Sequence, residues 1–159
     1  RFRPTLGGSE YLKEVFNVTK GEIPELSLED ELSLQNLVLE LNENKLISSA
    51  KDLSLGGLIV AICKMGFPSH IGANLDLTKI RKSRLDETLF GETSATVIIS
   101  FASALTDKVK ALCEKHKLEF NPIGNTISDK SISINGLGTI ANLDSLEEKY
   151  ESALVKVFE

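Results

Sequence analysis

The chain has 159 residues, of which 42% are hydrophobic and 26% are charged, a composition typical of one globular domain and not of a disordered chain. Its formal net charge is -5, from 18 basic and 23 acidic side chains, which disfavours DNA or RNA as the main ligand because such surfaces need clustered positive charge. No apolar run is long enough to cross a bilayer, so we also expect no membrane partner.

The cysteines and histidines limit the redox and metal chemistry. Cys63 and Cys113 are far apart and lie within apolar helical patterns, so we expect reduced, buried thiols in a cytoplasmic protein. With His70 and His116 as the only histidines and no Cys-x-x-Cys motif, no structural zinc site is expected. The only methionine is Met65, so we expect the chain to be part of a longer polypeptide.

Several proline and glycine residues interrupt residues 1–27, and this composition predicts an arm or linker that follows a preceding domain. A short helix over residues 9–16, capped by Ser9, is the one element expected there. Ser27 then begins a helix of the form Ser-x-x-acid that should run to about Asn44, at the start of an α/β domain over residues 28–159.

The rest of the chain alternates between strand and helix patterns. Strands are expected over 46–53, 71–77, 94–101, 118–123 and 131–135. Helices are expected over 58–65, over 85–90, from Thr106 to about His116, and from Asp144 onward. In the last helix, the residues expected to face inward are Leu146, Tyr150, Leu154 and Val157 or Phe158. This order favours an α/β sandwich in which helices pack on a single mixed β-sheet.

The stretch from Asp52 to Leu58 is the clearest candidate for a ligand-binding site. A predicted strand brings Asp52 and Ser54 to a turn, and Gly56-Gly57 then opens a helix. Helix N-termini attract anions, glycine allows a ligand to approach the backbone, and a carboxylate suits Mg²⁺. The alternative is purely structural, with Ser54 as a cap and the glycines permitting close packing. The residues alone leave both interpretations open.

Two further stretches are candidates. Glu92 and Thr93, within Leu-Phe-Gly-Glu-Thr at 89–93, lie at a helix-to-strand junction where a carboxylate could point into a cleft or simply into solvent. Residues 6–12, Leu-Gly-Gly-Ser-Glu-Tyr-Leu, form a backbone-rich turn before a short helix, or a joint between domains. No nucleophile and base stand at an informative spacing, so no catalytic residue is assigned.

Taken in order, these three stretches resemble the C-terminal region of the synthetase subunit (subunit II) of phosphoribosylformylglycinamidine synthase. The resemblance rests on residues 6–12, on Asp52-x-Ser54-x-Gly56-Gly57-Leu58, and on residues 89–93. It covers essentially the whole chain. It implies a fold like the C-terminal domain of aminoimidazole ribonucleotide synthetase, a relative in the same superfamily.

The resemblance also implies a function. The full enzyme uses ATP, Mg²⁺ and glutamine-derived ammonia to convert formylglycinamide ribonucleotide into its amidine in purine biosynthesis. Its partners are the preceding domains, a glutaminase subunit and a small accessory subunit. An auxiliary ATP/ADP site would involve Ser54, Gly56, Gly57, Glu92 and Thr93, with Asp52 on Mg²⁺. The catalytic residues lie in other domains, and the isolated domain is expected to be inactive.

Three departures from the family pattern count against an intact auxiliary site. Lys51 stands where the family usually has histidine, Leu55 where it has an acidic or polar residue, and residues 94–96 (Ser-Ala-Thr) where an arginine is common. Two alternatives therefore remain. The chain could belong to another ATP-using enzyme of the superfamily, such as thiamine-monophosphate kinase, or it could be a non-catalytic interaction or ligand-sensing domain.

Overall fold

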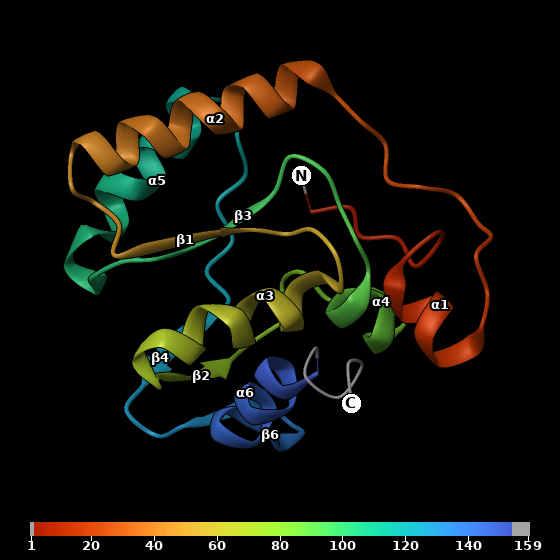
Figure 1. Cartoon of the computed structure of the whole chain (residues 1–159). Helices are drawn as coiled ribbons and strands as arrows, with labels where there is room; N and C mark the ends of the chain where they lie inside the picture. The colour runs from red at the N-terminus through yellow and green to blue at the C-terminus, as the bar shows by residue number, and fades with distance from the viewer. Residues whose placement is uncertain (1, 154–159) are drawn as a thin grey trace. The chain divides into compact units, whose positions relative to one another are not determined.

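The computed structural model describes residues 2–153 and confirms the expected α/β class, with six α-helices and six strands among those residues (Figure 1). The chain divides into two compact units. The first contains the residues up to Ala61 together with Ile80–Pro122, and the second contains Ile62–Lys79 and the residues from Ile123 onward. The predicted boundary after residue 27 stays a prediction.

Two predicted helix starts in the first unit are confirmed. Helix α1 (Glu10–Phe16) has Ser9 as its N-cap, whose hydroxyl accepts a hydrogen bond from the Leu12 amide. Helix α2 (Leu28–Glu43) begins after Ser27, which caps the Asp30 amide in the same way. In both cases a serine hydroxyl satisfies an amide that the first turn of a helix leaves without a partner.

The core of the first unit lies between α2 and α5 (Thr106–Lys115). Leu37 and Leu41 of α2 pack against Val109 and Cys113 of α5, and the two helices lie side by side in Figure 1. At the edge of this cluster, Glu40 accepts hydrogen bonds from Lys115 (2.6 Å), and its other oxygen lies 2.7 Å from His116 Nε2. These two partners lower the pKa of Glu40, Lys115 contributing more.

The first unit also contains a two-stranded sheet, helix α4 (Leu85–Phe90) and the first half of helix α3 (Gly57–Gly66), whose second half belongs to the second unit. Strands β1 (Ser49–Asp52) and β3 (Val97–Ser100) pair antiparallel, with Asp52 opposite Val97. Helix α3 starts shortly after β1, and α4 has the bounds that the sequence predicts. Buried Leu53, Leu58 and Leu89 lie in or beside these elements.

The second unit contains a four-stranded mixed sheet in the order β4-β2-β5-β6. Strand β2 (Gly72–Leu75) is antiparallel to β4 (Gly124–Ile127) and parallel to β5 (Ser131–Ile134), which is antiparallel to β6 (Gly138–Asn142). Helix α6 (Leu143–Ser152) follows β6 directly. The core of the second unit consists of Ala73, Leu75, Ile132, Ile134 and Leu143, together with residues of α3.

Several expectations were wrong in detail. The strands form two hydrogen-bonded sheets instead of one, because alternating apolar residues predict extension but not the pairing partner. The predicted strand over 118–123 is irregular: Leu118 and Phe120 are apolar because they pack on the α2–α5 core. Thr106 begins α5 but its hydroxyl donates to the Ser103 carbonyl instead of capping the helix.

Other expectations concern the helix termini, thiols and membrane spans. The inward orientation of Leu154 and of Val157 or Phe158 lies outside the described residues. Cys63 and Cys113 are free and buried, as expected, and burial raises the pKa of the Cys63 thiol to about 11. Within residues 2–153, no helix is long and apolar enough to span a bilayer.

The α2–α5 core makes a direct prediction about stability. Leu41 is 0% exposed whereas Leu39, on the same helix, is 60% exposed. Leu41→Ala should lower the free energy of unfolding by about 2–5 kcal/mol, because it removes buried methyl groups and leaves a cavity. Leu39→Ala should change it by no more than about 0.5 kcal/mol. Urea denaturation followed by circular dichroism measures both, and equal effects would contradict this placement of the core.

Candidate functional site

A single carboxylate brings the three motif stretches together. Glu92 Oε1 accepts a hydrogen bond from the Glu10 amide (3.0 Å) and another from the Gly56 amide (3.1 Å). Glu10 is the first residue of α1, and Gly56 directly precedes the first residue of α3. Amides at the start of a helix have no partner within the helix itself, and the helix dipole favours an anion there. Glu92 supplies the acceptor oxygen and the negative charge at both helix starts.

Backbone contacts reinforce this junction. Thr5 and Glu92 form an isolated antiparallel bridge in which each amide donates to the other's carbonyl, at 3.0 and 2.9 Å. The ring of Tyr11, on α1, stacks on Phe90 at the end of α4, with centroids 4.6 Å apart and an angle of 7° between the rings. Residues 5–11 and 89–93 are thus joined by both backbone and side chains.

The two glycines at the start of α3 both adopt a positive φ. Gly56 and Gly57 have φ values of +83° and +70°, in the left-handed region that other residues rarely adopt. A Cβ on Gly57 would lie 2.6 Å from the Gly91 carbonyl oxygen, so the backbone of α3 approaches the end of α4 closely. This supports the close-packing explanation for the Gly-Gly pair.

Asp52 and Ser54 lie on the exposed side of the same turn. The Asp52 side chain is 67% exposed and accepts a hydrogen bond from Lys51 Nζ at 2.9 Å. This bond, and a weaker one from the Ser54 hydroxyl, lower the pKa of Asp52. Lys51, which replaces the usual family histidine, therefore occupies part of the coordinating capacity that Asp52 would offer to a cation.

Thr93 lies apart from these residues. It is buried, its hydroxyl donates to the Ser94 carbonyl at 3.3 Å, and it contributes to an open cavity of ≈ 310 Å³. Of the predicted nucleotide-contacting residues, Thr93 alone lines this cavity; the remaining lining residues are Arg3, Glu25, Ser27, Asp30, Ser94 and Ala95.

The region where the family often carries an arginine is engaged internally. The Ala95 amide donates to Glu31 of α2 at 2.6 Å, and the Ser94 hydroxyl donates to the Glu25 carbonyl. Ala95 has a φ of +45°, so this turn is held in an uncommon conformation by its partners. The groups at 94–95 that could have bound a phosphate oxygen thus already have partners within the chain.

The sequence argument identified the three stretches but missed how they meet. The Glu10 amide and the Thr5 bridge were not expected to be part of the site, since a backbone amide has no residue signature. The one usable signal was an acidic residue, Glu92, next to a glycine at a helix-to-strand junction. Chemically, the arrangement leaves Asp52 and Ser54 exposed, with Asp52 partly engaged by Lys51, whereas Glu92 already accepts hydrogen bonds from the two helix starts.

Comparison with known proteins places the chain in a family. The family model described as AIR synthase related protein, C-terminal domain, matches residues 4–136. This match includes α1 to α5, β1 to β5 and every residue of the candidate site.

Two relatives share substantial sequence identity. Phosphoribosylformylglycinamidine synthase subunit PurL from Leptospira biflexa is 36% identical over 162 aligned residues, which cover 99% of this chain and 22% of that protein. PurL from Aquifex aeolicus is 38% identical over 143 residues, covering 90% of this chain and 19% of that protein. The chain thus spans about a fifth of the length of these relatives.

Solved structures share the fold. Phosphoribosylformylglycinamidine synthase II from Thermotoga maritima matches with a TM-score of 0.68 at 18% identity, over 78% of this chain and 22% of that chain. T. maritima PurL complexed with ATP matches with a TM-score of 0.64 at 20% identity, over 72% of this chain and 21% of that chain. PurLQS from the same organism matches with a TM-score of 0.62 at 17% identity, over 86% of this chain and 24% of that chain. At these identities the likeness concerns the fold alone.

The Glu92 junction makes a prediction about stability. Glu92→Ala leaves the Glu10 and Gly56 amides without their acceptor, so it should lower the free energy of unfolding by roughly 2–4 kcal/mol. Glu92→Gln keeps an acceptor oxygen and should cost no more than about half as much. Chemical denaturation of the three proteins measures this, and an Ala variant as stable as the Gln variant would contradict the two hydrogen bonds.

The Lys51–Asp52 pair makes a prediction about titration. Because Lys51 lowers the pKa of Asp52, Lys51→Met should raise it toward the value of a free aspartate. A lowered pKa in the folded state stabilises the fold above the pKa of the unfolded chain, and this contribution disappears as the pH falls through the folded value. At a site this exposed the contribution is small. A carboxyl ¹³C NMR titration of both proteins measures the shift; identical Asp52 curves would refute it.

Proposed function

We propose that this chain, which belongs to the AIR synthase related protein, C-terminal domain family, forms the C-terminal domain of the synthetase subunit of a phosphoribosylformylglycinamidine synthase. The observation that carries this proposal is the Glu92 junction, because it unites the three stretches on which the resemblance rests. The PurL relatives, which align over 90% or more of the chain at 36–38% identity, support it.

The reaction that we propose for the whole polypeptide is ATP-dependent C–N ligation. Formylglycinamide ribonucleotide, ATP and ammonia released from glutamine would give the formylglycinamidine ribonucleotide of purine biosynthesis. The T. maritima structures of PurL complexed with ATP and of PurLQS support a bound nucleotide and assembly into a larger complex. We propose that the partners in that complex are the preceding domains, a glutaminase subunit and a small accessory subunit. Buried free thiols support a reducing compartment, and we place the enzyme in the cytoplasm.

Within that enzyme, we assign this chain a mainly structural role. Asp52 offers an exposed carboxylate of the kind that suits Mg²⁺, with the Ser54 hydroxyl beside it. Gly56, Gly57 and Glu92 form the junction beside this turn, and the Gly56 amide is already held by Glu92. Thr93 lies apart from them and lines the cavity described above. A Mg²⁺ bound at Asp52 would neutralise nucleotide phosphate charge. Catalytic residues would come from elsewhere in the polypeptide.

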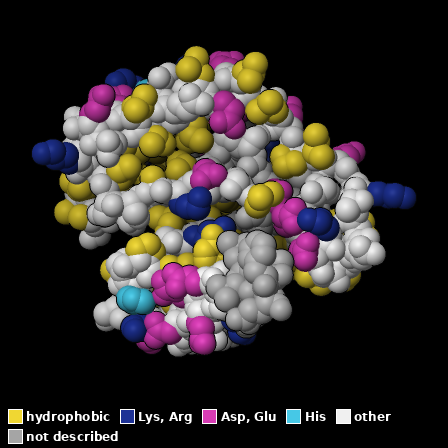
Figure 2. Space-filling view, viewed as in Figure 1, with side chains coloured by type: hydrophobic (Ala, Val, Ile, Leu, Met, Phe, Trp, Pro, Cys, Tyr) yellow, Lys and Arg dark blue, Asp and Glu magenta, His cyan; other side chains and the backbone are white. Residues whose placement is uncertain are grey.

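Exposed apolar side chains support contact with the preceding domains. Leu28, Leu32 and Leu39 of α2 are 77%, 60% and 60% exposed, and Figure 2 shows hydrophobic side chains interspersed with acidic ones at the surface over this helix. Further exposed apolar residues, Ile23 and Leu26, precede α2. Such surfaces usually mark contacts with other protein segments. We propose that neighbouring domains of the same polypeptide cover them.

The decisive assay uses the polypeptide encoded by the whole reading frame that contains these residues. With ATP, Mg²⁺, formylglycinamide ribonucleotide and ammonium, it should form the amidine and ADP, whereas the 159-residue chain alone should show no turnover. Mass spectrometry of the product measures both. Phosphorylation of thiamine monophosphate instead would favour the kinase of the same superfamily, and turnover by the chain alone would refute the assignment of catalysis to other domains.

A further inference from the structure

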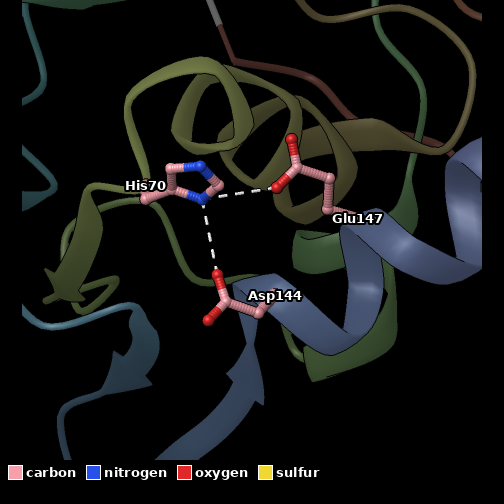
Figure 3. A group of neighbouring side chains, drawn as sticks. All are labelled: His70, Asp144 and Glu147. Atoms are coloured by element: carbon pink, nitrogen blue, oxygen red, sulfur yellow. Dashed lines mark ion pairs between the residues drawn. The ribbon is translucent and has the colours of Figure 1, made fainter.

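A cluster of three ligand-type side chains lies in the second unit and shares no residue with the candidate site. His70, Asp144 and Glu147 point toward one another, and their ligand atoms all lie within 4.8 Å (Figure 3). His70 Nδ1 is 3.4 Å from Asp144 Oδ1 and 3.4 Å from Glu147 Oε2. The two acids stand three positions apart on the first turns of α6, so both face the imidazole.

These separations fit a shared ion better than direct hydrogen bonds. A charge-assisted N–H···O bond has its heavy atoms about 2.7–2.9 Å apart. Nitrogen and oxygen ligands about 2.0–2.2 Å from a tetrahedral zinc ion are separated from each other by about 3.3–3.6 Å. Both observed separations, 3.4 Å, fall in the second range. The imidazole is therefore placed as one of three ligands around a common point.

We propose that His70 Nδ1, Asp144 Oδ1 and Glu147 Oε2 form a three-ligand site for a divalent metal ion of the zinc class. Imidazole nitrogen favours zinc, cobalt or nickel, whereas Mg²⁺ and Ca²⁺ favour oxygen ligands alone. Two carboxylates balance the 2+ charge. The side chains of His70 and Asp144 are each 50% exposed, so water completes the coordination and the ion exchanges with solvent.

The acidic ligands are held in position by the chain around them. Lys130 Nζ binds the other oxygen of Asp144, Oδ2, at 3.0 Å and leaves Oδ1 directed at the imidazole. Leu143, at the start of α6, is 0% exposed, and its amide donates to the Lys130 carbonyl at 2.9 Å. Such second contacts orient metal ligands and reduce the entropy lost on binding.

The histidine segment is anchored to the same helix. His70 follows a short 3-10 helix, η1 (Phe67–Ser69), and its own amide donates to the Phe67 carbonyl at 3.2 Å. The Phe67 ring lies against Tyr150 of α6, with centroids 5.8 Å apart, and Lys64 Nζ sits 5.0 Å from the centre of the same tyrosine ring. The segment that carries His70 is thereby tied to the helix that carries both acids.

This proposal departs from the expectation drawn from composition, which stays untested. That argument excluded zinc by counting cysteines and histidines, and it ignored carboxylates as ligands. The site shares no residue with the proposed Mg²⁺ contact at Asp52, so it stands or falls independently of the proposed function.

The test titrates the 159-residue chain with ZnCl₂ by calorimetry at neutral pH, and with CoCl₂ by visible absorption. We expect one ion per chain and a Co²⁺ absorption band. His70→Ala and Glu147→Gln should each weaken Zn²⁺ binding by about tenfold or more. Glu148→Gln, the adjacent exposed acid of α6, should leave binding unchanged, and excess Mg²⁺ should not displace Zn²⁺.

Circular dichroism of each variant first establishes that it is folded. A folded wild-type chain that binds no Zn²⁺ would overturn the proposal and leave the cluster as contacts between these three side chains alone. Binding that His70→Ala or Glu147→Gln retains in full would also overturn it, because the ion would then lie elsewhere.

Discussion

The carboxylate of Glu92 holds together parts of the chain that are more than eighty residues apart. It accepts hydrogen bonds from the amides of Glu10 and Gly56 and so completes the starts of both α1 and α3. The positive-φ glycines at the start of α3, the close approach of Gly57 to the end of α4 and the Thr5 bridge all lie at the same junction. If Glu92 is the internal anion at these helix starts, a phosphate group competes with it for the Gly56 amide. The exposed side chains of Asp52 and Ser54 then remain the polar groups of the motif turn that a ligand reaches without breaking this junction.

Local features of the sequence predicted local structure well. Ser9 and Ser27 were expected to cap helices and do so, because capping depends on a side chain and an amide three residues away. The bounds of α4 were also predicted, because the turn residues that flank it act at short range.

Long-range pairing could not be predicted in the same way. A strand pattern in β2 says that alternate side chains are buried, but not that its neighbours are β4 and β5. Leu118 and Phe120 have strand-like spacing yet pack as irregular chain on a helical core. The roles of Glu92 and of His70 depend on partners 82, 36 and more than seventy residues away, which no local pattern encodes. Family resemblance identified the first site because it compares whole stretches, and it identified nothing about the second.

The most direct measurement of the central claim is hydrogen exchange of the backbone amides, followed by ¹H–¹⁵N NMR. If the Glu92 carboxylate accepts bonds from both helix starts, the Glu10 and Gly56 amides should be protected from exchange, and both should lose that protection in Glu92→Ala. Glu10 and Gly56 amides that exchange freely in the unaltered chain, or that keep their protection in the variant, would contradict the junction.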